Sequence, residues 1–249
     1  MSLIGLVLGL AWWLRLGIEK EIVVAAARAA VQLLAVGVVF AAIFGSSTAM
    51  LWAASWVAGM VLVATIVVRR RVGMPLPGLA AVTAAVVAGT TTVSLAVTFG
   101  FGVIDLDPVS LVVVGGITVG NAVPSAVLGA KQAMSLCRDG WGQIEALLAL
   151  GFAPGQIVRF MAPRAARSSI VPQVERTKVV GLIALPGAMT GLLLAGVSPI
   201  DAVVIQLLVM YLVLGTATSC IVVVVATIVR TAVTPDLRAA DWTRPGAHA

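Results

Sequence analysis

Long uninterrupted apolar runs limit how this chain can fold more than any other feature. A helix needs about 20 apolar residues to cross about 30 Å of hydrocarbon. Because 61% of the 249 residues are apolar and only 10% are charged, a soluble fold of this length could not bury them all. We therefore predict seven membrane spans, at residues 3–16, 22–44, 49–68, 79–101, 109–130, 179–196 and 200–229.

The spans are predicted to be helices. The apolar runs show no period-2 alternation, which disfavours the strands of a β-barrel, and backbone groups in lipid must be satisfied internally. The predicted fold class is all-α: a polytopic membrane protein with about seven transmembrane helices, forming a single domain over residues 1–249 that includes a cytoplasmic segment at residues 131–177.

The basic residues predict the orientation of the chain. Lys and Arg follow the first, third, fifth and seventh runs, whereas the connections at residues 45–48, 102–108 and 197–199 contain none. The positive-inside bias then places the amino terminus outside and the carboxyl terminus in the cytoplasm of a cell (plasma or inner) membrane. The net charge of +6 is therefore attributed to orientation among lipids, with no nucleic acid as a partner. The first run precedes its charges, which indicates a retained anchor.

The segment at residues 131–177 is predicted to contain a short helix between two turns. Asp139 and Gly140 form a turn signal, and residues 143–150 follow as an amphipathic helix. Gly151 ends that helix, and Pro154 begins another that extends to about residue 167.

The pattern of Glu145, Ala146 and Gly151 is like the helix–glycine–helix segment that permeases of ABC transporters insert into their ATPase. Leu147, Leu148 and Leu150 would give this helix an apolar docking face. An alternative is a surface helix that lies on the membrane, with the arginines at positions 159, 164 and 167 near lipid headgroups.

The chain lacks the residues of common enzyme sites. No Gly-x-x-x-x-Gly-Lys-Ser/Thr phosphate loop and no Gly-x-Ser-x-Gly occurs. The single histidine, His248, is next to the last residue, which disfavours zinc or histidine catalysis. We expect no enzyme activity and no cofactor on this chain, so any ATP and Mg²⁺ would be bound by a partner subunit.

Five stretches spread along the chain match a known family. They start at Arg28 (RAAVQL), Val119 (VGNA), Glu145 (EALLALG), Gly181 (GLIALPGAMTG) and Gln206 (QLLVM). Through these stretches the sequence resembles the bacterial iron-export ABC permeases, whose plant relatives are linked to aluminium tolerance. The resemblance implies a permease subunit of an ABC transporter that forms a homodimer, is driven by a separate ATP-binding subunit and exports a metal ion such as iron. The chain departs from the family pattern at Ala188, where a methionine is usual.

Polar or soft side chains deep in the apolar runs are candidates for a substrate pathway, because such groups are costly in a bilayer. The candidates are Gln32, Asn121, Met189, Gln206 and Met210, together with Pro186 and Gly187, where proline interrupts a helix and frees backbone carbonyls. Met189 is also a soft candidate metal ligand. The alternative for each side chain is ordinary packing or a hydrogen bond to a neighbouring helix.

The charged residues Glu175, Arg176 and Lys178 lie where the chain is predicted to re-enter the membrane. They form either a solvated cluster at headgroup level or a cytoplasmic entry site for cations. A stand-alone secondary transporter or channel for a small cation is the alternative function class. The predicted spans hold no Asp or Glu in their interiors, which counts against proton coupling.

Overall fold

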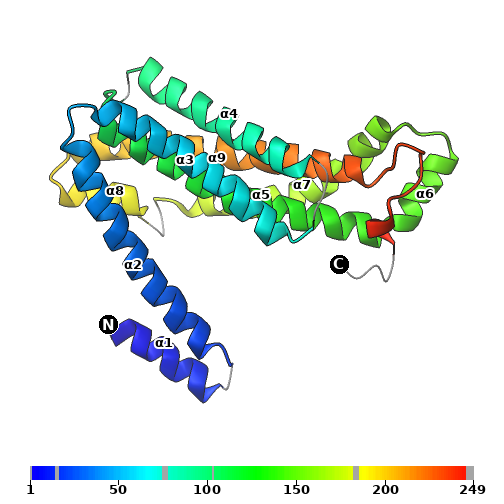
Figure 1. The fold of residues 1–249 in the computed structure, drawn as a ribbon, viewed down its shortest axis with the longest axis horizontal. Coiled ribbons are helices and arrows are strands. Elements are labelled where there is room, and N and C mark those ends of the chain that lie inside the picture. The colour runs from blue at the N-terminus through cyan, green and yellow to red at the C-terminus, as the bar shows by residue number, and fades with distance from the viewer. Residues whose placement is uncertain (1, 15–16, 75–77, 103, 182–184, 245–249) are drawn as a thin grey trace. The chain divides into compact units, whose positions relative to one another are not determined.

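The computed structural model describes residues 2–14, 17–74, 78–102, 104–181 and 185–244. These residues form α-helices and one short 3-10 helix, with no strand among them (Figure 1). The α-helices are α1 (Ser2–Trp13), α2 (Glu19–Phe44), α3 (Ala49–Val72), α4 (Leu79–Gly100), α5 (Pro108–Asp139), α6 (Trp141–Ala149), α7 (Pro154–Val179), α8 (Gly187–Leu194) and α9 (Pro199–Thr231), and the 3-10 helix is η1 (Asp241–Thr243). The prediction of an all-α fold is confirmed.

Within the described residues, five helices are long and apolar enough to cross a membrane: α2, α3, α4, α5 and α9. They coincide with five of the predicted runs, to within four residues at every end except the carboxyl end of α5. Helices α1 and α8 have 12 and 8 residues, fewer than the roughly 17 that a span requires. The prediction of a multi-pass membrane protein is confirmed, whereas the count of seven spans and the orientation remain predictions.

The chain divides into two compact units, Met1–Trp52 and Ala53–Ala249. In the first unit, α1 contacts α2 across a connection in which Gly17 has a φ of 69°. Most of the large apolar side chains of α2, such as Leu33 and Leu34, are exposed within this unit. A helix that is apolar on all sides suits a surrounding of lipid or of other protein.

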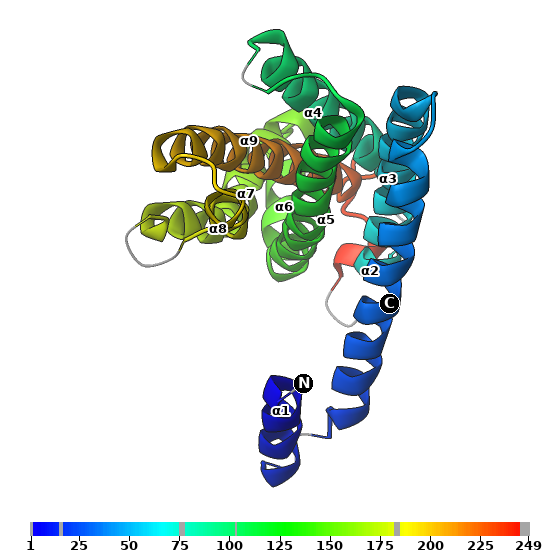
Figure 2. The same ribbon diagram turned by 90° about the vertical axis from the view of Figure 1, so that its left-hand side faces the viewer.

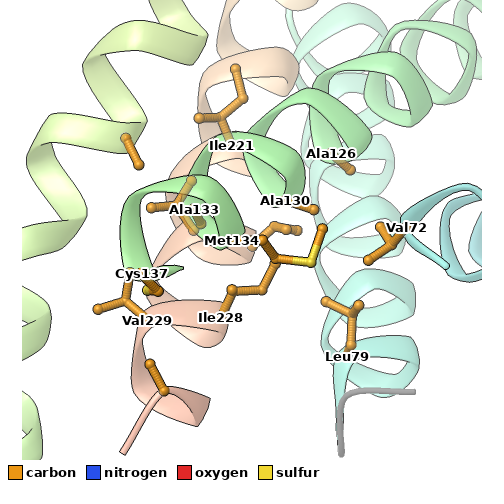
Figure 3. Close-up of a cluster of buried hydrophobic side chains, with 14 of the residues drawn as sticks. Val72, Leu79, Ala126, Ala130, Ala133, Met134, Cys137, Ile221, Ile228 and Val229 are labelled. Atoms are coloured by element: carbon orange, nitrogen blue, oxygen red, sulfur yellow. The ribbon is translucent and has the colours of Figure 1, made fainter. Parts of the chain in front are cut away.

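In the second unit, α5 and α9 pack along each other, and α4 and α7 pack against both. Small residues on α5 allow this close approach: a Cβ added at Gly129 would lie 3.3 Å from the Cα of Ile221. Figure 3 shows Ala130 and Ala133 of α5 beside the larger side chains of α9, including Ile228. Ala130, Ala133 and Ile228 are fully buried, so the α5–α9 pair is the core of this unit.

The structure differs from the predictions mainly over residues 131–196. Helix α5 continues past residue 130 to Asp139, and α7 extends to Val179, well beyond residue 167. Residues 179–196, predicted as one span, do not form one helix, because the backbone becomes extended at Val180 and α8 begins only after Pro186. A charged side chain such as Lys131 ends an apolar run in the sequence without ending a helix, which explains why the apolar run is shorter than α5.

Candidate functional site

Helix α6 is separated from α5 by a tight turn at Gly140. A Cβ added at Gly140 would lie 2.8 Å from the carbonyl oxygen of Leu136 and 3.1 Å from the Cε atom of Met161 on α7. The Gly140 N–H also donates to that Leu136 carbonyl at 2.9 Å. Glycine is therefore the residue that lets α5, α6 and α7 meet this closely.

The other end of α6 is closed by a Schellman motif. The Gly151 N–H donates to the Leu148 carbonyl at 2.9 Å, and the Phe152 N–H donates to the Leu147 carbonyl at 3.0 Å. Gly151 has a φ of 80°, a conformation that costs other residues about 1–2 kcal/mol. Pro154 then begins α7. The predicted short helix between two glycine turns is thus present, and both of its ends are fixed.

The side chains of α6 divide into an inner and an outer face. Ile144 is fully buried, and Leu147 and Leu148 are half-buried against the core. Ala146 and Gly151 lie on the exposed side, together with the exposed residues Ala149 and Leu150, and Leu150 is 75% exposed. The exposed surface of α6 is therefore small and apolar, and it is centred on the carboxyl end of the helix.

The carboxylate of Glu145 is engaged within the chain. Its Oε1 accepts a hydrogen bond from the Ala239 N–H at 3.2 Å. Ala239 belongs to residues 232–244, here called the C-terminal strap, which folds back after α9: the Ala240 N–H donates to the Ala232 carbonyl at 2.9 Å. The Trp242 indole N–H donates a hydrogen bond to the Thr231 carbonyl at 3.3 Å, which ties the strap to the end of α9. No pattern in the sequence indicates the contact of Glu145 with Ala239, residues that are 94 positions apart.

The predicted pathway residues on α5 and α9 are partly or fully buried. Gln206 is 8% exposed, and its Oε1 has no hydrogen-bond partner among the described residues. Asn121 is half-buried, and its side-chain amide donates to the Ile117 carbonyl one turn earlier at 2.8 Å. Met210 is half-buried on α9. Gln32 is exposed on α2 in the first unit. The Gln206 Oε1 atom is thus a buried acceptor left unpaired among the described residues, and such groups usually bind a water molecule or another partner.

The interruption expected at Pro186 and Gly187 is present. Pro186 is the amino-terminal cap of α8, and its carbonyl accepts from the Thr190 N–H at 3.0 Å. Met189 is half-buried in the first turn of α8. Helix α8 packs against α9 (Figure 2), so the helices that carry Met189 and Gln206 are neighbours. The described residues contain no group of three or more His, Cys, Asp or Glu side chains that could hold a metal ion.

A row of hydroxyl groups on α4 was missed by the sequence analysis. Thr83, Thr91, Ser94 and Thr98 are buried on the face of α4 that packs against α5 and α9. Thr98 donates to the carbonyl one turn earlier at 2.8 Å, the usual arrangement in apolar helices, whereas the Oγ1 atoms of Thr83 and Thr91 have no partner among the described residues. The available signal was their spacing of eight, three and four residues, which places them on one face of a helix.

Proteins of known sequence resemble this chain over most of its length. UPF0014 membrane protein slr1647 of Synechocystis sp. is 31% identical over 238 residues, covering 92% of this chain and 90% of that protein. Protein ALUMINUM SENSITIVE 3 of Arabidopsis thaliana is 30% identical over 203 residues, covering 82% and 74%. The probable iron export permease protein FetB of Escherichia coli is 29% identical over 220 residues, covering 82% and 78%.

No solved structure matches the chain. The resemblance to iron-export permeases and to their plant relatives is confirmed by these matches. A family model matches residues 1–233, which is nearly the whole chain, and the chain therefore belongs to the family described as Uncharacterised protein family (UPF0014).

Proposed function

We propose that this chain is the membrane-spanning permease subunit of an ABC transporter that exports a metal ion such as iron. A separate ATP-binding subunit, which holds ATP and Mg²⁺, drives it, and two copies of the chain form a homodimer. The relative named as a probable iron export permease supports the substrate class. The five long apolar helices support a role in crossing the membrane.

The observation that carries the proposal is the geometry of α6. A short helix fixed at both ends by glycine turns moves as one body when a partner pushes on it. Its exposed carboxyl end, with Ala146, Leu150 and Gly151, fits a cleft on an ATPase. Glu145, Leu147 and Leu148 support this surface from inside the chain. An apolar contact of this kind is stable when it is desolvated at its centre.

The substrate pathway in this proposal follows the α8–α9 region. Gln206 and Met210 on α9 lie on the helix against which α8 packs, and the break before Gly187 supplies backbone carbonyls. Met189 is the proposed soft ligand, and Asn121 belongs to the same proposed pathway. Gln32 on α2 is a separate pathway candidate in the first unit. The single permease domain over residues 1–249 is placed with its amino terminus outside, so that residues 131–177, including α6, face the cytoplasm and the ATPase.

A pull-down with matched variants tests the proposal. Tagged full-length chain is purified from membranes of its native host, and the ATP hydrolysis of the complex is measured with Fe²⁺, Mn²⁺ and Zn²⁺. We expect an ATP-binding protein to co-purify, and Leu150→Arg to abolish its retention because a charge is placed at the docking surface. Leu106→Arg is the control, since Leu106 is 59% exposed in a different connection. Absence of an ATP-binding protein from the wild-type preparation would refute the proposal.

A further inference from the structure

Helices α4 and α9 pack against each other and run in opposite directions (Figure 1). Leu79, at the start of α4, and Ile228, near the end of α9, belong to the same buried cluster. Farther along α4, the Thr90 hydroxyl lies within hydrogen-bonding reach of the Cys220 thiol on α9. Because the helices are antiparallel, each step forward along α4 from Thr90 corresponds to a step backward along α9 from Cys220.

This register places Thr216 of α9 opposite Ser94 of α4. Each of them is four residues from the contact between Thr90 and Cys220, which keeps it on the same face of its helix and about 6 Å farther along. Both side chains are buried: Thr216 is 3% exposed and Ser94 is 4% exposed. Both helices are long and apolar enough to cross a membrane, so the two hydroxyl groups meet in the middle of two spans.

Several oxygens in this interface lack a hydrogen-bond partner among the described residues. They are the Oγ1 atoms of Thr83, Thr91 and Thr216, on side chains that are 0%, 3% and 3% exposed. Burying a hydroxyl without a partner is costly, and proteins satisfy such groups with bound water. Thr216 faces Ser94 without a direct hydrogen bond to it, so a water molecule between them can bond to both. The polar seam is defined here as Thr83, Thr91 and Ser94 of α4 with Thr216 of α9.

The polar seam is continued on α9 by Gln206. Its Oε1 atom is also buried without a partner among the described residues. Gln206 comes ten residues before Thr216, close to three helical turns, so it lies about 15 Å away along nearly the same face. The sequence of α4 contains no Asp, Glu, Lys or Arg, and those of α9 are confined to its ends. The polar groups that line this interface are therefore neutral.

We propose that the polar seam binds water and forms a stretch of the translocation path for a hydrated divalent cation. This inference rests on the proposed function, because it takes the chain to be a metal exporter, and it continues the proposed pathway from Gln206 along α9. Neutral hydroxyl groups suit such a path, since they hydrogen-bond to the water shell of the ion and hold it weakly. Conduction requires weak binding, because a transported ion must also leave.

The two cysteines of the chain are natural probes of this water. Both are 0% exposed, but Cys220 borders the polar seam, whereas Cys137 is enclosed by the apolar core beside Val229 (Figure 3). Membranes of the native host that contain the full chain are supplied with ATP and Mn²⁺ and treated with a permanently charged methanethiosulfonate reagent, which reaches thiols only through water. We expect Cys220 to be labelled at least tenfold faster than Cys137. Equal rates, or faster labelling of Cys137, overturn the proposal.

Thr216→Val tests the hydroxyl group itself, because it keeps the shape of the side chain and removes the oxygen. We expect labelling of Cys220 and Mn²⁺ export from host cells to slow at least fivefold. Thr65→Val on α3 is the matched control, since the Thr65 hydroxyl donates to the Val61 carbonyl at 3.0 Å, and it should change neither rate. Unchanged labelling and export in Thr216→Val contradict the proposal. So does a higher unfolding temperature of Thr216→Val, which would mark a dry, unpaired hydroxyl.

A second variant covers a failure of Thr216→Val to insert into the membrane. Ser94→Ala then decides by the same labelling, and an unchanged Cys220 rate overturns the proposal. The proposed function is judged separately, by co-purification. If the polar seam is dry and an ATP-binding protein still co-purifies, the proposed function stands. If the polar seam is hydrated and no ATP-binding protein co-purifies, the proposed function is refuted instead.

Discussion

The hydrogen bond between Glu145 and the C-terminal strap predicts that this carboxylate holds the strap on α6. The Ala239 N–H is its donor, and Ala239 is 3% exposed. The neighbouring amides have other acceptors: the Arg238 N–H donates to the Thr234 Oγ1 at 3.1 Å, and the Ala240 N–H donates to the Ala232 carbonyl at 2.9 Å. Glu145 is therefore the acceptor that closes the strap onto α6.

The perturbation is Glu145→Ala, which leaves the Ala239 N–H without an acceptor in a buried position. A hydrogen bond to a charged group contributes about 1.5–3 kcal/mol. Because Glu145 is only half-buried, water replaces part of this, and we expect a loss of about 1–2 kcal/mol. Such a loss corresponds to about a 5–30-fold change in the opening equilibrium of the strap. Glu145→Gln keeps an oxygen acceptor in the same place and should lose much less.

Hydrogen exchange of the purified chain measures this opening directly. Peptides that cover the C-terminal strap should exchange about 5–30 times faster in Glu145→Ala than in the wild type, and peptides within α5 should be unchanged. Glu145→Gln should exchange within a few-fold of the wild type. If strap peptides exchange equally fast in Glu145→Ala and in the wild type, Glu145 does not hold the C-terminal strap on α6. A direct contact between Glu145 and a partner would then be the remaining explanation.

Two glycines give further predictions about packing. Gly140→Ala places a Cβ 2.8 Å from a backbone oxygen, and overpacking of this kind costs about 1–3 kcal/mol. The apparent unfolding temperature of the chain should therefore fall. An unchanged temperature would show that the turn can open to make room for the methyl group. Gly129→Val pushes against the Cα of Ile221 and should lower that temperature further, because both α5 and α9 must move; a smaller effect than in Gly140→Ala would contradict the central place of the α5–α9 pair.

The long apolar helices could be predicted because a single strong signal specifies them. In α2, α4 and α9 the apolar run and the helix end within a few residues of each other. The positions of glycine and proline were equally informative around α6. As expected, Gly140 forms the turn before α6, Gly151 ends α6 and Pro154 begins α7. These residues act through local backbone geometry, so their effect does not depend on distant parts of the chain.

The parts that could not be predicted depend on tertiary packing. Lys131 ends an apolar run, but α5 continues because its next two turns bury Ala133, Met134 and Cys137 in the core. The partner of Glu145 is 94 positions away, beyond the reach of any local pattern. The hydroxyl row of α4 was visible as a spacing, but Thr and Ser often satisfy themselves within a helix, and only packing reveals which hydroxyls are left unpaired.

Helix α7 connects α6 to a helix end that carries exposed charged side chains. It begins directly after α6 and ends at the charged turn that contains Glu175. Pro163 and Pro172 lie inside it, and each removes one backbone hydrogen bond and allows the helix to bend. Ile157, Met161 and Ala165 fix its first half in the core, whereas its last turns carry exposed charges. If a partner pushes on α6, as the proposed function requires, α7 would carry that movement and bend near Pro172.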